Sequence, residues 1–135
     1  MHDRAVESRI TGLLADMNAI GGYPMSLVCT SQGLLIAASG EALRSEITAG
    51  LTCLFDDIVA RAARDLELLH VDELTLSDSS AGYTIVRPLM HDAAQLRLFL
   101  VVQVPRGGTW RRNTNLVVRK LLAILRPWLS SQETP

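Results

Sequence analysis

The chain has few of the residues from which catalytic and metal-binding sites are assembled. It holds two cysteines and three histidines in 135 residues, and no CxxC pair occurs. Because His2, His70 and His91 lie far apart, the sequence predicts no metal site, whose ligands must converge. The adjacent Asp56 and Asp57 diverge by about 100° on a helix and do not form a carboxylate pair. With no P-loop, dinucleotide fingerprint or nucleophile elbow, we expect no enzyme activity and no cofactor.

Signals for secretion and membrane insertion are also lacking. The N-terminus is polar, and no apolar run approaches the roughly 20 residues that span a bilayer. Cys29 and Cys53 form no disulfide framework, which indicates a reduced, cytoplasmic setting. Cys53, on a helix, is either a reactive surface thiol or a buried, inert one, and we expect the buried and inert state.

Negative charge is lacking in one long segment and concentrated in another. Residues 93–132 contain no acid, whereas residues 41–78 contain nine acids and three arginines. The net charge of −1 gives no overall attraction to nucleic acid or anionic lipid. One interpretation is that both segments are simply solvated surface. The alternative is that they are used for self-association or for binding an acidic partner. Arg106, Trp110, Arg111 and Arg112 resemble a basic-aromatic patch, for which a protein contact or a solvated loop is favoured over stacking on a base.

The apolar pattern predicts helices and strands in a definite order. Apolar residues at helical spacing begin at Val6, and Gly21-Gly22 is expected to end that helix. A last helix is expected to begin at a cap on Thr114 or Asn115 and to end or kink at Pro127. The predicted elements are a helix over 4–18, strands over 25–30 and 34–39, a helix over 43–66, strands over 73–77, 83–89 and 96–104, with a turn over 91–95, and the last helix.

The long helix over 43–66 carries two distinct faces. A wide apolar arc is predicted to be its core face, and it comprises Ile47, Leu51, Leu54, Phe55, Ile58, Val59, Ala62 and Leu66. A stripe of small and charged residues beside it is open to the close approach of another helix. This stripe consists of Gly50, Cys53, Asp57, Ala60 and Arg64, with Arg61 at its border. Asp57 and Arg64 are expected to pair across a two-fold axis, with a solvated stripe as the alternative.

The strand over 73–77 alternates between apolar and polar residues. Leu74 and Leu76 lie on one side, and Glu73, Thr75 and Ser77 on the other, which predicts a half-exposed strand at a sheet edge. The run over 96–104 is the longest β-type apolar run and is predicted to be a central strand.

Three segments together resemble the Roadblock family of dynein light-chain Roadblock-type domains. They are residues 27–40 (LVCTSQGLLIAASG), 83–89 (YTIVRPL) and 100–105 (LVVQVP), and the resemblance spans residues 6–126. It implies an α+β fold in the order α-β-β-α-β-β-β-α. The sheet would have five antiparallel strands, with one long helix on one face and two helices on the other.

The resemblance also implies a function through surfaces. Family members dimerise through the second helix and the middle edge strand, and bacterial members bind Ras-like small GTPases. On this chain the dimer contact would comprise Gly50, Cys53, Asp57, Ala60, Arg61, Arg64, Glu73, Thr75 and Ser77. The intervening loop over 106–114 departs from the family pattern.

We therefore expect one Roadblock-like domain over 4–129, with flexible tails over 1–3 and 130–135. Its expected role is a non-enzymatic homodimer that binds a Ras-like GTPase, acting as its activating protein or without that activity. We expect no nucleic-acid partner and no segment that spans a membrane. The alternatives are a homo- or heteromeric scaffold subunit and a ligand sensor of PAS or GAF type, which requires a cavity of more than about 300 Å³.

Overall fold

The computed structural model describes residues 4–89 and 97–133. The turn predicted over 91–95 lies outside the described residues. The chain forms α1 (Arg4–Gly21), β1 (Met25–Thr30), β2 (Leu35–Gly40), α2 (Ala42–Asp65), β3 (Leu74–Asp78), β4 (Gly82–Pro88), β5 (Leu98–Val104) and α3 (Arg111–Glu133). The predicted order of elements and the predicted fold class are confirmed.

Five antiparallel strands form one sheet in the order β2-β1-β5-β4-β3. The apolar run that predicted a central strand is β5, which pairs with β1 and β4; Leu100 lies opposite Val28 on one side and Arg87 on the other. β3 pairs with β4 and lies at the edge of the sheet, as predicted.

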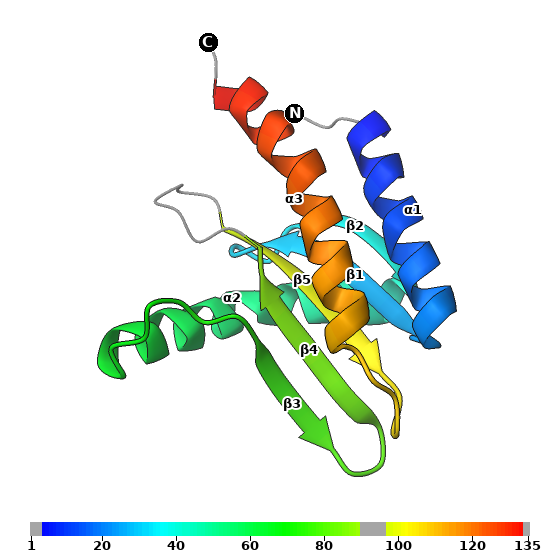
Figure 1. Cartoon of the computed structure of the whole chain (residues 1–135), viewed down its shortest axis with the longest axis vertical. Helices are drawn as coiled ribbons and strands as arrows, with labels where there is room; N and C mark the ends of the chain where they lie inside the picture. The colour runs from blue at the N-terminus through cyan, green and yellow to red at the C-terminus, as the bar shows by residue number, and fades with distance from the viewer. Residues whose placement is uncertain (1–3, 90–96, 134–135) are drawn as a thin grey trace.

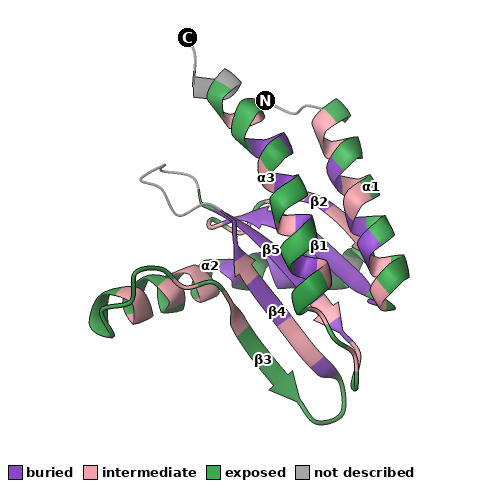
Figure 2. Ribbon diagram, viewed as in Figure 1, coloured by how far each residue is buried: buried purple, intermediate pink, exposed green. Residues whose placement is uncertain are grey.

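Helices cover both faces of the sheet. α1 and α3 lie side by side on one face, and α2 crosses the other (Figure 1). β1, in the interior of the sheet, is buried along its whole length, as its apolar composition predicted (Figure 2). The core under α1 and α3 includes Ile10, Leu14, Val28, Leu100 and Leu121, and a smaller core under α2 includes Met25, Leu27, Cys29, Ala49 and Phe99.

α3 begins earlier than predicted and does not end at Pro127. It begins at Arg111, so the predicted cap on Thr114 or Asn115 was wrong. Thr114 is buried in the first turn, where its hydroxyl donates to the carbonyl of Trp110 at 2.8 Å. The helix also continues past Pro127, because Trp128 and Leu129 pack against the core and hold the following turn in place.

Candidate interaction surface

α2 meets its own sheet with small and hydroxyl-bearing residues. Ser45, Thr48, Ala49 and Thr52 are buried against the sheet side of the helix. Each hydroxyl donates to the backbone carbonyl one helical turn earlier: Ser45 to Glu41 at 2.9 Å, Thr48 to Arg44 at 2.8 Å and Thr52 to Thr48 at 3.0 Å. These bonds satisfy the hydroxyls, so the polar side chains are buried without an unpaired donor.

The predicted core face of α2 is only partly confirmed. Phe55 packs against the smaller core, whereas four other residues of the apolar arc are turned toward solvent, and for these four the prediction was wrong. Ile47, Leu51, Leu54 and Ile58 are 57%, 45%, 58% and 50% exposed. Their spacing of four, three and four residues places them in one row along the helix. We call these four residues the apolar stripe. A row of large aliphatic side chains in water is typical of a surface that meets another molecule.

The apolar stripe lies on the flank of α2 that faces β3. Phe55 of α2 packs in the same cluster as Leu74 of β3 and Val86 of β4. Arg44 of α2 lines a hollow of about 240 Å³ together with Leu76 of β3. Leu76 is 47% exposed. The exposed apolar surface therefore continues from α2 toward the open edge of the sheet.

The predicted contact stripe lies next to the apolar stripe, and its residues are exposed. They are Gly50, Cys53, Asp57, Ala60, Arg61 and Arg64. At 100° per residue, Gly50, Asp57 and Arg61 adjoin the apolar stripe, and the others lie further round the helix. Gly50 also lies beside the β1–β2 turn, since a Cβ on Gly33 would be 3.4 Å from its Cα.

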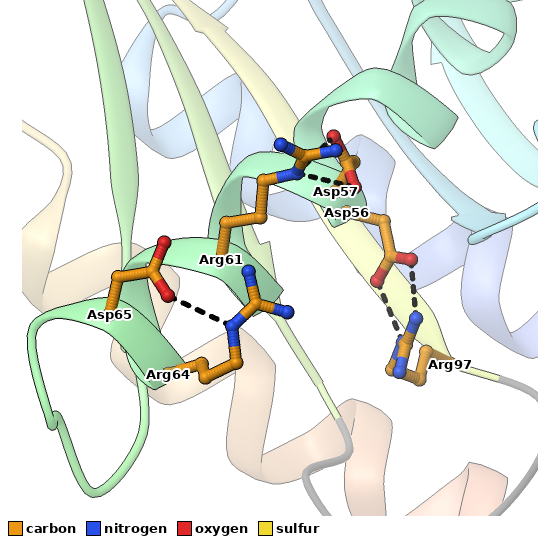
Figure 3. Close-up of polar contacts among 6 residues, drawn as sticks. All are labelled: Asp56, Asp57, Arg61, Arg64, Asp65 and Arg97. Atoms are coloured by element: carbon orange, nitrogen blue, oxygen red, sulfur yellow. Dashed lines mark hydrogen bonds and ion pairs between the residues drawn. The ribbon is translucent and has the colours of Figure 1, made fainter.

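Two arginines of α2 form ion pairs with acids of the same helix (Figure 3). Arg61 binds Asp57 at 3.0 Å, and Arg64 binds Asp65 at 2.9 Å. Both pairs are well exposed and contribute little to stability. The pairing of Asp57 with Arg64 of a second copy stays a prediction.

Two predicted residues of the β3 edge, Thr75 and Ser77, are exposed. Glu73 precedes the strand and is only half-buried. Its carboxylate accepts a hydrogen bond from the indole N–H of Trp110 at 3.0 Å and from the Thr75 hydroxyl at 2.7 Å. Glu73 thus ties the start of β3 to the loop that precedes α3, a contact that the sequence did not indicate.

The basic-aromatic segment is engaged within the fold at its tryptophan. The ring of Trp110 packs on Tyr83 with centroids 4.7 Å apart, and the Arg111 guanidinium lies 5.0 Å from the Trp110 centroid. Trp110 is therefore a structural contact of β4 and does not stand free to stack on a base.

The two thiols have opposite environments. Cys29 lies in β1 and is fully buried, and this burial raises its pKa to about 11. Cys53 is exposed on α2, so the expectation that it is buried was wrong. Its thiol lies 3.3 Å from the Gly50 carbonyl.

The described residues hold no cluster of metal ligands, and the hollow on α1 is not an enclosed site. Within residues 4–89 and 97–133, no three His, Cys, Asp or Glu side chains are placed to hold a metal ion. A hollow of about 330 Å³ is lined by Arg4, Glu7, Ser8 and Thr11, all on α1, and it is open to solvent. A depression on one exposed helix does not enclose a ligand and does not favour the sensor alternative. No helix in the described part of the chain is long and apolar enough to cross a membrane.

The sheet order and the helix layers define a Roadblock-type fold. MglB of Myxococcus xanthus is similar over 100% of this chain and 97% of its own, with a TM-score of 0.75 and 13% identity. The gliding protein MglB of Thermus thermophilus is similar over 89% and 90%, with a TM-score of 0.75 and 13% identity. A Roadblock/LC7 domain from Streptomyces avermitilis is similar over 89% and 97%, with a TM-score of 0.71 and 15% identity. By sequence, the chain matches no family model and no curated protein.

Proposed function

We propose that two copies of this chain associate through α2 and β3 into a non-enzymatic dimer that binds and regulates a Ras-like small GTPase in the cytoplasm. One observation carries the dimer: four aliphatic side chains of the apolar stripe are 45–58% exposed on a helix whose opposite face already covers the sheet. The Roadblock-type fold and the family resemblance support the choice of partner.

The proposed interface has an apolar centre and a polar border. Ile47, Leu51, Leu54 and Ile58 form the centre, which continues to Leu76 on β3. The predicted contact residues Gly50, Cys53, Asp57, Ala60, Arg61, Arg64, Glu73, Thr75 and Ser77 lie around it. Two helices of 24 residues and two edge strands are long enough to bury the roughly 1,000 Å² that a stable interface requires.

Pairing of β3 with β3 of a second copy also gives the edge strand a partner. The outer edge of β3 carries backbone donors and acceptors that β4 does not use. An isologous pair of edges would join the two sheets, with both α2 helices on one face and both α1–α3 layers on the other.

For the GTPase we propose activation of GTP hydrolysis as the form of regulation, without assigning a catalytic arginine. Arginine fingers act by entering the active site of the GTPase. Arg61 and Arg64 are exposed on the proposed interface but are paired with acids of their own helix. A dimeric scaffold without effect on hydrolysis is the alternative.

The dimer is tested by an acidic substitution on α2 and a matched one on α1. Leu54→Asp places charges at the apolar centre and is expected to give monomers at micromolar concentration, measured by sedimentation velocity. Ile20→Asp is the matched control, because Ile20 is a similarly large aliphatic residue, 76% exposed, on α1. If Leu54→Asp sediments as the unmodified protein does, the apolar stripe is not the interface.

Ala60→Glu tests which of the two stripes of α2 lies at the two-fold axis of the dimer. Like charges at Ala60 also dissociate the dimer if the predicted small-residue stripe lies at the two-fold axis. A dimer that tolerates Ala60→Glu but not Leu54→Asp has its axis at the apolar stripe.

The GTPase partner is tested by capture followed by kinetics. The dimer is expected to retain a small GTPase, and its addition is expected to raise that protein's rate of GTP turnover. Binding without a change in turnover would favour the scaffold. The capture uses an extract of the cells that naturally produce the chain. If no small GTPase is retained from this extract, the proposal is contradicted.

A further inference from the structure

The outer face of α3 carries an unpaired row of cations. Arg112, Arg119, Lys120 and Arg126 are exposed, and none of the four lies within ion-pair distance of a carboxylate in the described parts of the chain. At 100° per residue they fall within an arc of about 120°. Arg112 and Arg126 are separated by about 21 Å along the helix axis. We call these four residues the basic face.

Acids are concentrated in the segment that holds α2 and β3. The sequence of α3 holds five cations and a single acid, Glu133 at its last position, and α1 holds two of each. Residues 41–78, which include α2 and β3, hold nine acids and three arginines. The two helix layers are about 20 Å apart, from two layer spacings of about 10 Å. This separation exceeds the Debye length of about 8–10 Å, so the acids of α2 do not cancel the attraction of an anionic surface to the basic face.

We propose that the basic face docks on an anionic lipid surface. The four cations are spread along one exposed face of α3, the helix that lies in front of the sheet in Figure 2. A spread row of flexible cations matches a broad layer of phosphate and carboxylate headgroups. Hot spots of protein interfaces are enriched in Trp and Tyr as well as Arg, and the four residues of the basic face include no aromatic side chain. Trp110, the aromatic nearest the start of α3, is engaged with Tyr83 and Glu73.

The proposed dimer strengthens this contact without being required for it. Joining two sheets through β3 places both basic faces on the same side, which makes binding bivalent. The part of the affinity that comes from bivalence rests on the proposed function, and the contact of one basic face does not. Vesicle binding by the monomeric Leu54→Asp variant therefore tests the lipid contact separately from dimerisation. Binding that survives in this variant supports the lipid contact, even if the unmodified protein proves not to dimerise.

The test measures binding to vesicles of equal parts phosphatidylserine and phosphatidylcholine. Vesicles of pure phosphatidylcholine, which carry no net charge, are the control. The protein is expected to co-sediment with the anionic vesicles and to dissociate as salt is raised. Each basic residue near an anionic leaflet adds about fivefold to binding, so Arg119→Glu with Lys120→Glu is expected to weaken binding at least about twentyfold. Arg119→Lys with Lys120→Arg keeps the charge and is expected to bind as the unmodified protein does.

Circular dichroism of both double variants checks that α3 is intact. Failure to bind the anionic vesicles, or equal binding to neutral vesicles, overturns the proposal. Tighter binding to polyglutamate or to duplex DNA than to the anionic vesicles also overturns it and assigns the basic face to an acidic macromolecule.

Discussion

Arg97, just before β5, holds Asp56 of α2 through two parallel hydrogen bonds. The guanidinium Nε lies 2.7 Å from one carboxylate oxygen, and an Nη lies 2.5 Å from the other (Figure 3). The Asp56 side chain is 13% exposed, and its hydrogen bonds raise the pKa of Arg97. This pair fixes the middle of α2 at the end of the sheet, which sets the direction in which the apolar stripe points.

Removal of this pair is expected to loosen α2. Asp56→Ala is expected to lower the free energy of unfolding by about 1–2 kcal/mol, because a bidentate pair whose carboxylate is largely buried is worth more than an exposed one. Asp65→Ala, which breaks the exposed pair with Arg64, is expected to cost less than about 0.5 kcal/mol. Urea denaturation at one protein concentration measures both, and equal effects would contradict a special role for Asp56.

Truncation of Leu51 distinguishes a partner-facing residue from a core residue. Leu51 is 45% exposed, so Leu51→Ala leaves no closed cavity and is expected to change monomer stability by less than about 1 kcal/mol while weakening the dimer. Leu121 is fully buried, and Leu121→Ala is expected to cost about 2–5 kcal/mol. Both are measured in the Leu54→Asp background, where dimerisation does not contribute. A cost for Leu51→Ala as large as that for Leu121→Ala would place Leu51 in the core.

The two cysteines are expected to differ in reactivity. Cys53 is exposed and should react with a thiol reagent in the native protein, more slowly in the dimer than in the Leu54→Asp variant. Cys29 is buried with a raised pKa and should react only after unfolding. Mass spectrometry after partial labelling assigns the modified residue, and modification of native Cys29 would contradict its burial.

The raised pKa of Cys29 links stability to alkaline pH. The folded protein keeps this thiol protonated up to about pH 11, whereas the ordinary pKa of a cysteine thiol is 9.0, so the folded state holds the proton more tightly. The stabilisation is present below pH 9 and is lost as pH rises toward 11. Over this window the unmodified protein is expected to lose about 2 kcal/mol more than Cys29→Ala does. Parallel stability curves for the two proteins would show that Cys29 is not the linked group.

The sequence predicted the elements better than it predicted the direction in which α2 faces. The apolar runs of β1 and β5 have only one stable place, in a sheet covered on both faces, and there they lie. α2, by contrast, has two faces that are able to pack on the sheet: the apolar arc and the face that carries Thr48 and Thr52. Thr48 and Thr52 satisfy their hydroxyls on the helix itself, so a face that is polar in the sequence is the one that packs on the sheet.

Contacts between segments that are distant along the chain could not be predicted from the sequence, because they leave no local pattern in it. The bond between Glu73 and Trp110 joins residues 37 positions apart, and periodicity carries no information on such pairs. Arg87 likewise donates to the Asp72 carbonyl at 2.8 Å and to Asn115 at 2.9 Å, which links the approach to β3 with the start of α3. Neither tie has a local signature, since each depends on how the loops return to the sheet.

The solution mass of the unmodified chain and of Leu54→Asp, measured side by side at micromolar concentration, tests the central claim most directly. The account predicts twice the chain mass of 14.8 kDa for the unmodified protein and a single chain mass for the variant. A single chain mass for the unmodified protein, with the apolar stripe left in water, would contradict it.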